Sequence, residues 1–158
     1  MAKAHSMAYA CMPMFFWPAP AIPVRKTIVD INDELAEDAK NKLGFENFSS
    51  DWKEVINDKD IDVVDICTPN NTHPEMAIAA AKAGKHIICE KPLARNASEA
   101  KDMYDAVKKS NIIHMVAFNY RRTPAVALAK KIISENKIGK VSNIGKIKFK
   151  TVFGNIFQ

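Results

Sequence analysis

Apolar residues follow two different spacings along this chain, and the spacings predict alternating strands and helices. Nearly continuous apolar runs predict strands at 24–31, 61–67, 85–89 and 112–118. Helical spacing predicts helices at 2–10, 32–44, 74–84, from 96 onward and at 124–136, with a further turn or two at 51–57. The alternating run 146–150 predicts a half-exposed strand.

Local signals support the ends of these helices. Gly44 and Gly84 stand where a helix C-terminus favours a left-handed residue. Pro74 and Pro124 suit a first helical turn, and Asn96 with Glu99 three residues later forms a capping-box-like start. The segment 11–24, which holds four prolines, is expected to be a loop.

Strands that alternate with helices at this spacing predict an α/β fold of the Rossmann type, with a doubly wound parallel sheet. Ligands of such sheets bind outside the carboxyl ends of the strands. The loops after Asp30, Cys67, Cys89 and Phe118 are therefore the places to search for a site.

Composition limits the class of protein. A length of 158 residues, with 47% hydrophobic and 26% charged residues, suits one ordinary globular domain. The three cysteines form no close C-x-x-C pair and their number is odd, so neither a disulfide framework nor a zinc site is indicated. We expect a reducing, cytoplasmic location.

The net charge of +5 is concentrated near the C-terminus, where residues 130–150 hold seven lysines and a single acid, Glu135. These lysines alternate with apolar residues and lack arginine clusters, so a solvated strand face is favoured over a nucleic-acid site. The apolar segment 11–24 contains too many prolines for a signal peptide or a membrane span.

Asp30 is a candidate for cofactor binding because it ends a predicted strand. A carboxylate at that place can accept hydrogen bonds from both hydroxyls of an adenosine ribose. A role as a helix cap explains the presence of Asp30 equally well. The following residues, Ile31 and Asn32, offer no cation for a 2′-phosphate, which favours NAD over NADP.

Two further loops combine polar groups at strand ends. The run from Thr68 to His73 has hydroxyl, amide and imidazole groups, though turn chemistry alone could account for its Pro and Asn residues, and His73 could help to cap the next helix. Glu90-Lys91-Pro92 follows a buried strand, and its alternative interpretation is a surface ion pair.

Together these loops resemble a known family. The run CTPNNTHPEMAIAAAKAGKHIICEKPL, from Cys67 to Leu93, is similar to the family of glucose-fructose oxidoreductase, inositol dehydrogenase and the rhizopine-catabolism protein MocA. The run VAFNYRRTPAVALAKKI, from Val116 to Ile132, resembles the same family's segment that leads into its substrate domain. The resemblance covers nearly the whole chain.

The resemblance implies roles for particular residues. Thr68, Pro69, Asn70 and His73 would line the nicotinamide and its ribose, and Asn119 and Arg121 would lie near the mouth of the cofactor or substrate site. Glu90 and Lys91 would form the family's Glu-Lys-Pro signature, in which the Lys91–Pro92 bond can be cis. Lys91 is the catalytic candidate, because its ammonium could hydrogen-bond the reacting hydroxyl or carbonyl.

The family begins with a strand and a G-x-G-x-x-G/A turn that binds the pyrophosphate. The start of this chain resembles the end of that turn, with Ala2 at the third glycine position and Lys3 beside it, so we expect a fragment that lacks the first strand. That absence should leave a gap between the strands ending at Asp30 and Cys67. We expect an incomplete dinucleotide-binding domain at 1–122, then a linker helix and the first strand of a truncated α+β substrate domain at 123–158.

By this resemblance the chain represents an NAD(P)-dependent dehydrogenase, with NAD favoured, that acts on a hydroxyl of a sugar or of a cyclitol such as an inositol. The alternative is a non-catalytic nucleotide-binding relic or interaction module. The expected partner is a small sugar or polyol, with no metal, nucleic acid or membrane. The full-length protein is expected to be a homo-oligomer.

Overall fold

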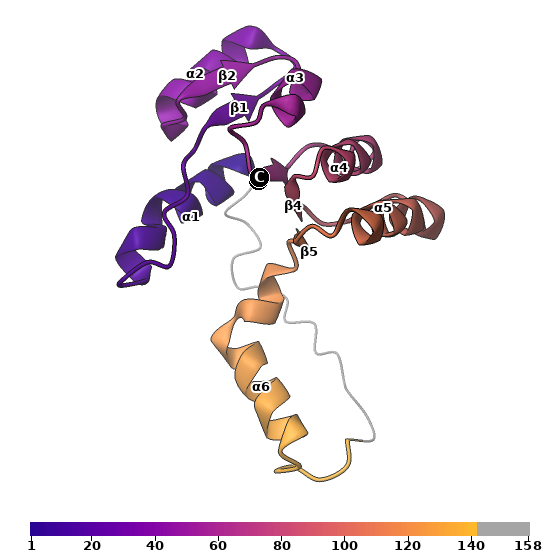
Figure 1. The fold of residues 1–158 in the computed structure, drawn as a ribbon. Coiled ribbons are helices and arrows are strands. Elements are labelled where there is room, and N and C mark those ends of the chain that lie inside the picture. The colour runs from indigo at the N-terminus through magenta and orange to yellow at the C-terminus, as the bar shows by residue number, and fades with distance from the viewer. Residues whose placement is uncertain (142–158) are drawn as a thin grey trace, which may run out of the picture. The chain divides into compact units, whose positions relative to one another are not determined.

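The computed structural model describes residues 1–141, which separate into two compact units (Figure 1). The first unit is Met1–Phe118, and the second begins at Asn119. The domain boundary expected from the sequence, after residue 122, stays a prediction. Among the described helices, none is long and apolar enough to cross a bilayer.

The larger sheet of the first unit is parallel and has three strands, in the order β3-β4-β5. They are β3 (Val63–Ile66), β4 (His86–Cys89) and β5 (His114–Val116). The helices α4 (His73–Lys82) and α5 (Ala97–Ser110) connect them and pack against each other, and α3 (Trp52–Asn57) precedes β3. The predicted alternation of strands and helices is confirmed here.

The hydrophobic core lies around this three-stranded sheet. Ile66 and Ile87 come from neighbouring strands, and Met103 and Val107 come from α5, where they are four residues apart and share one face. A run of small residues, Ala77, Ala80 and Ala81, lets α4 lie close to the sheet. Burial of these groups provides the main hydrophobic stabilisation of the unit.

The second sheet pairs β1 (Thr27–Val29) with β2 (Asn47–Ser49), again parallel. The helix α2 (Asp33–Leu43) connects them. Within 27–49, Ala36 is the one buried hydrophobic residue. Leu35, on α2, is exposed.

No hydrogen-bonded pairing joins β1 to β3 in the described part of the chain, so the sheet is in two parts. The sequence predicted a gap at this place, between the strands that lead to Asp30 and Cys67, and that prediction is confirmed.

The structure confirms several predicted helix ends. The side chain of Asn32 accepts the Leu35 N–H at 2.9 Å at the start of α2, and Asn96 accepts the Glu99 N–H at 3.0 Å at the start of α5. Gly44, with φ of 70°, takes the left-handed conformation after α2.

One helix was predicted to end too early, and one strand was not predicted. The first helix, α1 (Ala2–Phe15), continues through Pro13 instead of ending near residue 10. Pro13 lies near the end of the helix, where the last turn still closes by the Phe16 N–H bond to the Met12 carbonyl. The strand β2 was not expected, because the segment Asn47–Ser49 is too short to show a period and acquires strand geometry by pairing with β1.

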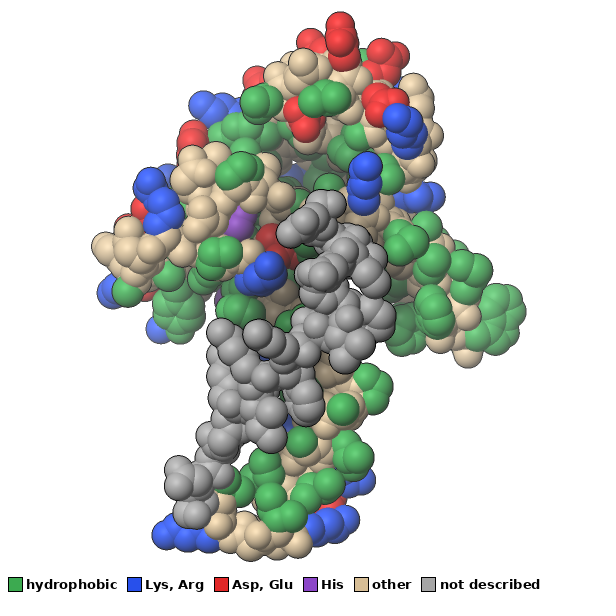
Figure 2. All heavy atoms as spheres, turned by 180° about the vertical axis from the view of Figure 1, so that it is seen from behind, with side chains coloured by type: hydrophobic (Ala, Val, Ile, Leu, Met, Phe, Trp, Pro, Cys, Tyr) green, Lys and Arg blue, Asp and Glu red, His purple; other side chains and the backbone are tan. Residues whose placement is uncertain are grey.

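The end of α1 and the residues after it expose large apolar side chains, which Figure 2 shows as a hydrophobic area. They are Met14, Phe15, Phe16 and Trp17. The second unit contains a 3-10 turn, η1 (Asn119–Arg122), and α6 (Pro124–Ser134), as predicted for a helix opened by Pro124. The predicted strand at 146–150 lies outside the described residues.

Candidate active site

The register of the three-stranded sheet brings three loops to one edge. Ile66, Cys89 and Val116 are paired across the strands at their carboxyl ends. Beyond this row, the Glu90 N–H donates to the Ile66 carbonyl at 2.9 Å, and the Ala117 N–H donates to the Cys89 carbonyl at 2.8 Å. The loops that follow β3, β4 and β5 therefore leave the sheet together, at the edge where ligands of parallel sheets bind.

The loop after β3 is a turn held by its own threonines. The Thr68 and Thr72 hydroxyl oxygens are 2.7 Å apart, and the Thr72 hydroxyl donates to the Pro69 carbonyl at 2.8 Å. Thr68 and Pro69 are exposed and Asn70 is half-buried. These three predicted cofactor residues thus lie on one ordered turn at the carboxyl edge.

His73 is the first residue of α4, and its ring is buried, with 1% of the residue exposed. Nε2 lies 2.9 Å from the Thr68 carbonyl oxygen, and Nδ1 lies 3.1 Å from that of Pro92 and 3.2 Å from that of Leu93. The ring therefore connects the loop after β3 to the loop after β4. Its described contacts are with the backbone, and the expected contact with nicotinamide stays a prediction.

The Glu-Lys-Pro segment begins directly after β4. Glu90 is buried, and one of its carboxylate oxygens accepts the Lys91 N–H at 2.9 Å. Lys91 itself is exposed, and the Lys91–Pro92 peptide is cis, which the resemblance had allowed. The segment therefore presents a lysine at the edge from which the Thr68 turn also leaves.

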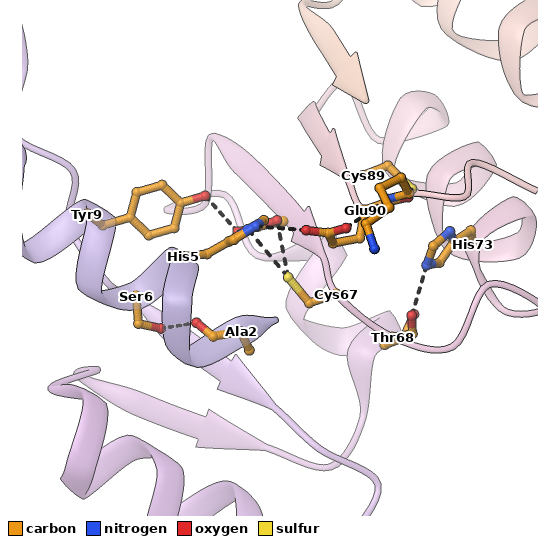
Figure 3. A network of polar contacts seen from close by, with 11 residues as sticks. Ala2, His5, Ser6, Tyr9, Cys67, Thr68, His73, Cys89 and Glu90 are labelled. Carbon is orange, nitrogen blue, oxygen red and sulfur yellow. Dashed lines mark hydrogen bonds and ion pairs between the residues drawn. The ribbon is translucent and has the colours of Figure 1, made fainter. Parts of the chain in front are cut away.

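A network that the sequence did not reveal joins α1 to this edge (Figure 3). His5 Nδ1 lies 2.8 Å from a carboxylate oxygen of Asp65 on β3, and His5 Nε2 lies 3.1 Å from Oε1 of Glu90. The Tyr9 hydroxyl donates to the same Asp65 oxygen at 2.6 Å. Ala2 and Lys3, the predicted pyrophosphate residues, are exposed in the first turn of the same helix.

Much of this region is buried, and burial raises the pKa of one tyrosine and two cysteines in it. Burial, with the hydrogen bond to Asp65, raises the pKa of Tyr9 well above its usual value of 10. Burial and the charge of Asp65 also raise the pKa of Cys67 to about 12, and burial raises that of Cys89 to about 11. Both thiols are therefore protonated at neutral pH and are poor nucleophiles.

His5, Asp65 and Cys67 each offer one ligand atom, and these atoms lie within 4.8 Å of one another. Nitrogen, oxygen and sulfur donors of this kind could hold a divalent metal such as zinc. In the structure they contact each other instead, with the Cys67 sulfur 3.5 Å from His5 Nδ1 and 3.6 Å from Asp65 Oδ1.

The remaining predicted residues are on other elements. Asp30 follows β1, in the separate two-stranded sheet; it is exposed, and its Oδ1 accepts the Asn32 N–H at 3.1 Å. Asn119 and Arg121 belong to η1 in the second unit. The first unit thus brings together Thr68, Pro69, Asn70, His73, Glu90 and Lys91.

The residues that the sequence did not reveal as part of the site are His5, Tyr9 and Asp65. His5 and Tyr9 are four residues apart on α1, which places them on one helix face, but nothing in the sequence shows which strand that face meets. Asp65 is a charged residue inside an apolar strand, and that was the available signal, because a half-buried carboxylate needs hydrogen-bond partners.

Two surface hollows formed by described residues lie away from this edge. One lies on α4 and α5 and is lined by residues such as Lys82 and Asp105. The other lies beside β1, β2 and α3 and is lined by residues such as Phe48 and Val55. Neither hollow is lined by a residue of the Thr68 turn or the Glu-Lys-Pro segment, so both are separate from the candidate site at the strand ends.

A parallel α/β sheet with polar loops at its carboxyl edge is a nucleotide-binding arrangement of the Rossmann class. Residues 24–118 match the family described as "Oxidoreductase family, NAD-binding Rossmann fold". The chain therefore belongs to the family of glucose-fructose oxidoreductase, inositol dehydrogenase and MocA.

Curated relatives and solved structures agree with this assignment. The chain is 70% identical over 141 residues to levoglucosan dehydrogenase from Pseudarthrobacter phenanthrenivorans, a match that covers 89% of this chain and 36% of the relative. It is 37% identical over 113 residues to myo-inositol 2-dehydrogenase from Thermotoga maritima, which covers 72% of this chain and 34% of the relative. The chain thus spans about a third of the length of these relatives.

A solved structure of levoglucosan dehydrogenase in complex with NADH and levoglucosan matches with a TM-score of 0.87 and 70% identity. This match covers 89% of the chain and 38% of that structure's chain.

Proposed function

We propose that this chain is the cofactor-binding part of an NAD-dependent dehydrogenase that oxidises a hydroxyl group of a sugar or cyclitol. The observation that carries the proposal is the 70% identity to levoglucosan dehydrogenase over nearly nine-tenths of the chain, together with the gathering of the Thr68 turn and Lys91 at one sheet edge. An anhydro sugar such as levoglucosan is the first substrate to test.

The described residues fit a nicotinamide cofactor. The Thr68-Pro69-Asn70 turn and Glu90 would lie along the nicotinamide and its ribose. His73 would hold the loops after β3 and β4 together through its contacts with the Thr68 and Pro92 carbonyls. Ala2 and Lys3, in the exposed first turn of α1, would lie near the pyrophosphate. NAD supplies the hydride acceptor when it is bound.

Lys91 is the proposed catalytic residue. It is exposed at the carboxyl edge, where its ammonium can hydrogen-bond the oxygen of the reacting carbon and assist the movement of the hydroxyl proton. Asn119 and Arg121 would contribute at the mouth of the site.

Asp30 would bind the adenosine ribose through its carboxylate. It is exposed at the end of β1, and its contact with the Asn32 N–H leaves oxygen lone pairs for the ribose hydroxyls. Because a carboxylate repels a 2′-phosphate, we propose a preference for NAD over NADP. A homo-oligomeric assembly and a cytoplasmic location also stay predictions.

The catalytic role of Lys91 is tested by Lys91→Ala in a form of the protein extended to the length of its relatives. We expect kcat to fall by roughly 10²–10⁴-fold while the affinity for NAD changes little, because the amine contacts the reacting centre. Steady-state kinetics with levoglucosan and NAD, plus calorimetric titration of NAD, provide the measurement. Lys59→Ala, another exposed lysine, is the matched control. An unchanged kcat would exclude the catalytic role.

The role of Asp30 is tested by Asp30→Ala, with Asp62→Ala as control, since Asp62 is an exposed aspartate just before β3. We expect Asp30→Ala to weaken NAD binding by roughly tenfold or more, through loss of charge-assisted hydrogen bonds, with a smaller effect on kcat. Equal effects of both substitutions, or an unchanged ratio of NAD to NADP affinity, would contradict this role. A protein that binds neither dinucleotide in the extended form would favour a non-catalytic module.

A further inference from the structure

The buried carboxylate of Glu90 connects the proposed catalytic lysine to α1. One oxygen, Oε2, accepts the backbone N–H of Lys91 at 2.9 Å, so the orientation of the carboxylate restrains the backbone at that lysine. The other oxygen, Oε1, faces His5 Nε2 at 3.1 Å. Only 4% of Glu90 is exposed, and a carboxylate so far from water requires partners at both oxygens.

His5 is itself held in place. Its Nδ1 faces the Asp65 carboxylate at 2.8 Å, and Tyr9, one turn further along α1, donates to that same carboxylate oxygen. The ring has one nitrogen on each side, so a single imidazole faces two carboxylates at once. Figure 3 shows His5 and Tyr9 extending from α1 towards Glu90 and Cys67.

The backbone that follows Lys91 is also held in place. His73 contacts the carbonyl oxygens of Pro92 and Leu93, the two residues after Lys91. The exposed Lys91 therefore lies between two restrained backbone positions. One depends on His5 and the other on His73. The side chain is free to meet a ligand while its backbone is fixed.

We propose that His5 is a positioning residue for Lys91, acting through the Glu90 carboxylate. The proposal rests on the proposed catalytic role of Lys91. Without His5, Oε1 of Glu90 loses its ring partner, the carboxylate turns towards water or another donor, and the Lys91 N–H loses its acceptor. The lysine then samples several orientations, and a misplaced group of this kind slows a reaction without changing cofactor affinity.

Amide hydrogen exchange of this chain, followed by NMR, tests the link without any need for activity. In His5→Phe, which keeps a ring but has no donor, we expect the protection of the Lys91 amide to fall roughly tenfold, as for a lost hydrogen bond to a charged group. His5→Gln retains an N–H donor and should restore part of that protection. The β4 amides, such as that of Ile87, should change little in either variant.

Tyr9→Phe is the matched control, because it removes a contact to Asp65 and leaves the contact between His5 and Glu90. It should leave the Lys91 amide protected. Unchanged protection of Lys91 in His5→Phe would overturn the proposal, and so would an equal loss of protection at Lys91 and throughout β4, which would indicate a purely structural role.

Kinetics in the extended form then separate this proposal from the proposed function. We expect His5→Phe to lower kcat roughly tenfold with an unchanged KM for NAD, and His5→Gln to recover part of the loss. If the Lys91 amide loses protection but kcat is the same, His5 still positions the lysine, and the catalytic role of Lys91 is wrong. If kcat falls while the Lys91 amide stays protected, the route through Glu90 is wrong.

Discussion

The two parallel sheets of the first unit obey the same local rules but bury very different numbers of side chains. Each has a helix that starts at an asparagine cap, Asn32 or Asn96, and ends at a left-handed residue, Gly44 or Asn111. The three-stranded sheet nevertheless holds the hydrophobic core, whereas the β1–β2 sheet with α2 buries Ala36. Caps and turns therefore do not determine where a core forms.

The difference comes from the number of paired edges. The central strand β4 is bonded on both sides, α4 packs against its sheet, and α5 packs against α4. In the described residues β1 is bonded on one side, to β2. A sheet with more strands and packed helices removes more apolar surface from water, so the three-stranded part should dominate the stability of the unit.

The largest expected effect follows from substituting the same residue type in each sheet. Ile66→Ala, in the core beside β4, should lower the free energy of unfolding by about 2–5 kcal/mol, because it leaves a cavity. Ile28→Ala, in the half-buried β1, should lower it by less than half as much, since Ile28 buries less surface. Urea denaturation followed by circular dichroism measures both. Equal losses would show that the two sheets contribute alike.

The second comparison uses two left-handed glycines, one in each region. Gly84→Ala, after α4, should lower the free energy of unfolding by about 1–2 kcal/mol, because alanine disfavours the left-handed backbone there. The added methyl group itself has open space around it. Gly44→Ala should cost more, because the added carbon would lie 3.3 Å from the Arg25 guanidinium, which donates to the Leu43 carbonyl. Thermal unfolding of both variants tests this order. Asparagine tolerates this conformation better, so Gly44→Asn should lose less than Gly44→Ala.

The smallest effect concerns pH and the start of α5. The hydrogen bonds from Arg95 hold the pKa of Glu99 below its usual value of 4.5. A lowered pKa in the folded state means that the unfolded state binds more protons, so this contribution is fully present above pH 4.5 and is lost as the pH falls through the folded value.

Glu99→Gln should therefore flatten the decline of stability below pH 4.5, by less than either glycine substitution changes stability at neutral pH, because water screens the pair. Glu37→Gln, at an exposed acid on α2, is the control from the other region. Denaturation series at several pH values give the comparison. If stability declined equally steeply in Glu99→Gln and in the wild-type chain, the Arg95–Glu99 ion pair would not contribute to the pH dependence.

Apart from β2, the order of strands and helices, most helix ends and the loops of the site could be read from the residues alone. Asn32, Asn96, Gly44 and Pro124 act on neighbouring backbone groups, so their effects can be read locally. The Thr68 turn and the Glu-Lys-Pro segment were recognisable because they follow buried strands directly, and parallel strands end at one edge.

Contacts between groups far apart in the chain could not be read in this way. The sequence gives no register between α1 and β3, so the pairing of His5 and Tyr9 with Asp65, 60 and 56 residues away, could not be predicted. The strand β2 likewise exists because β1 supplies its hydrogen bonds. The buried position of His73 depends on three backbone carbonyls from two loops. Such contacts depend on packing between elements far apart in the chain, which local residue patterns do not encode.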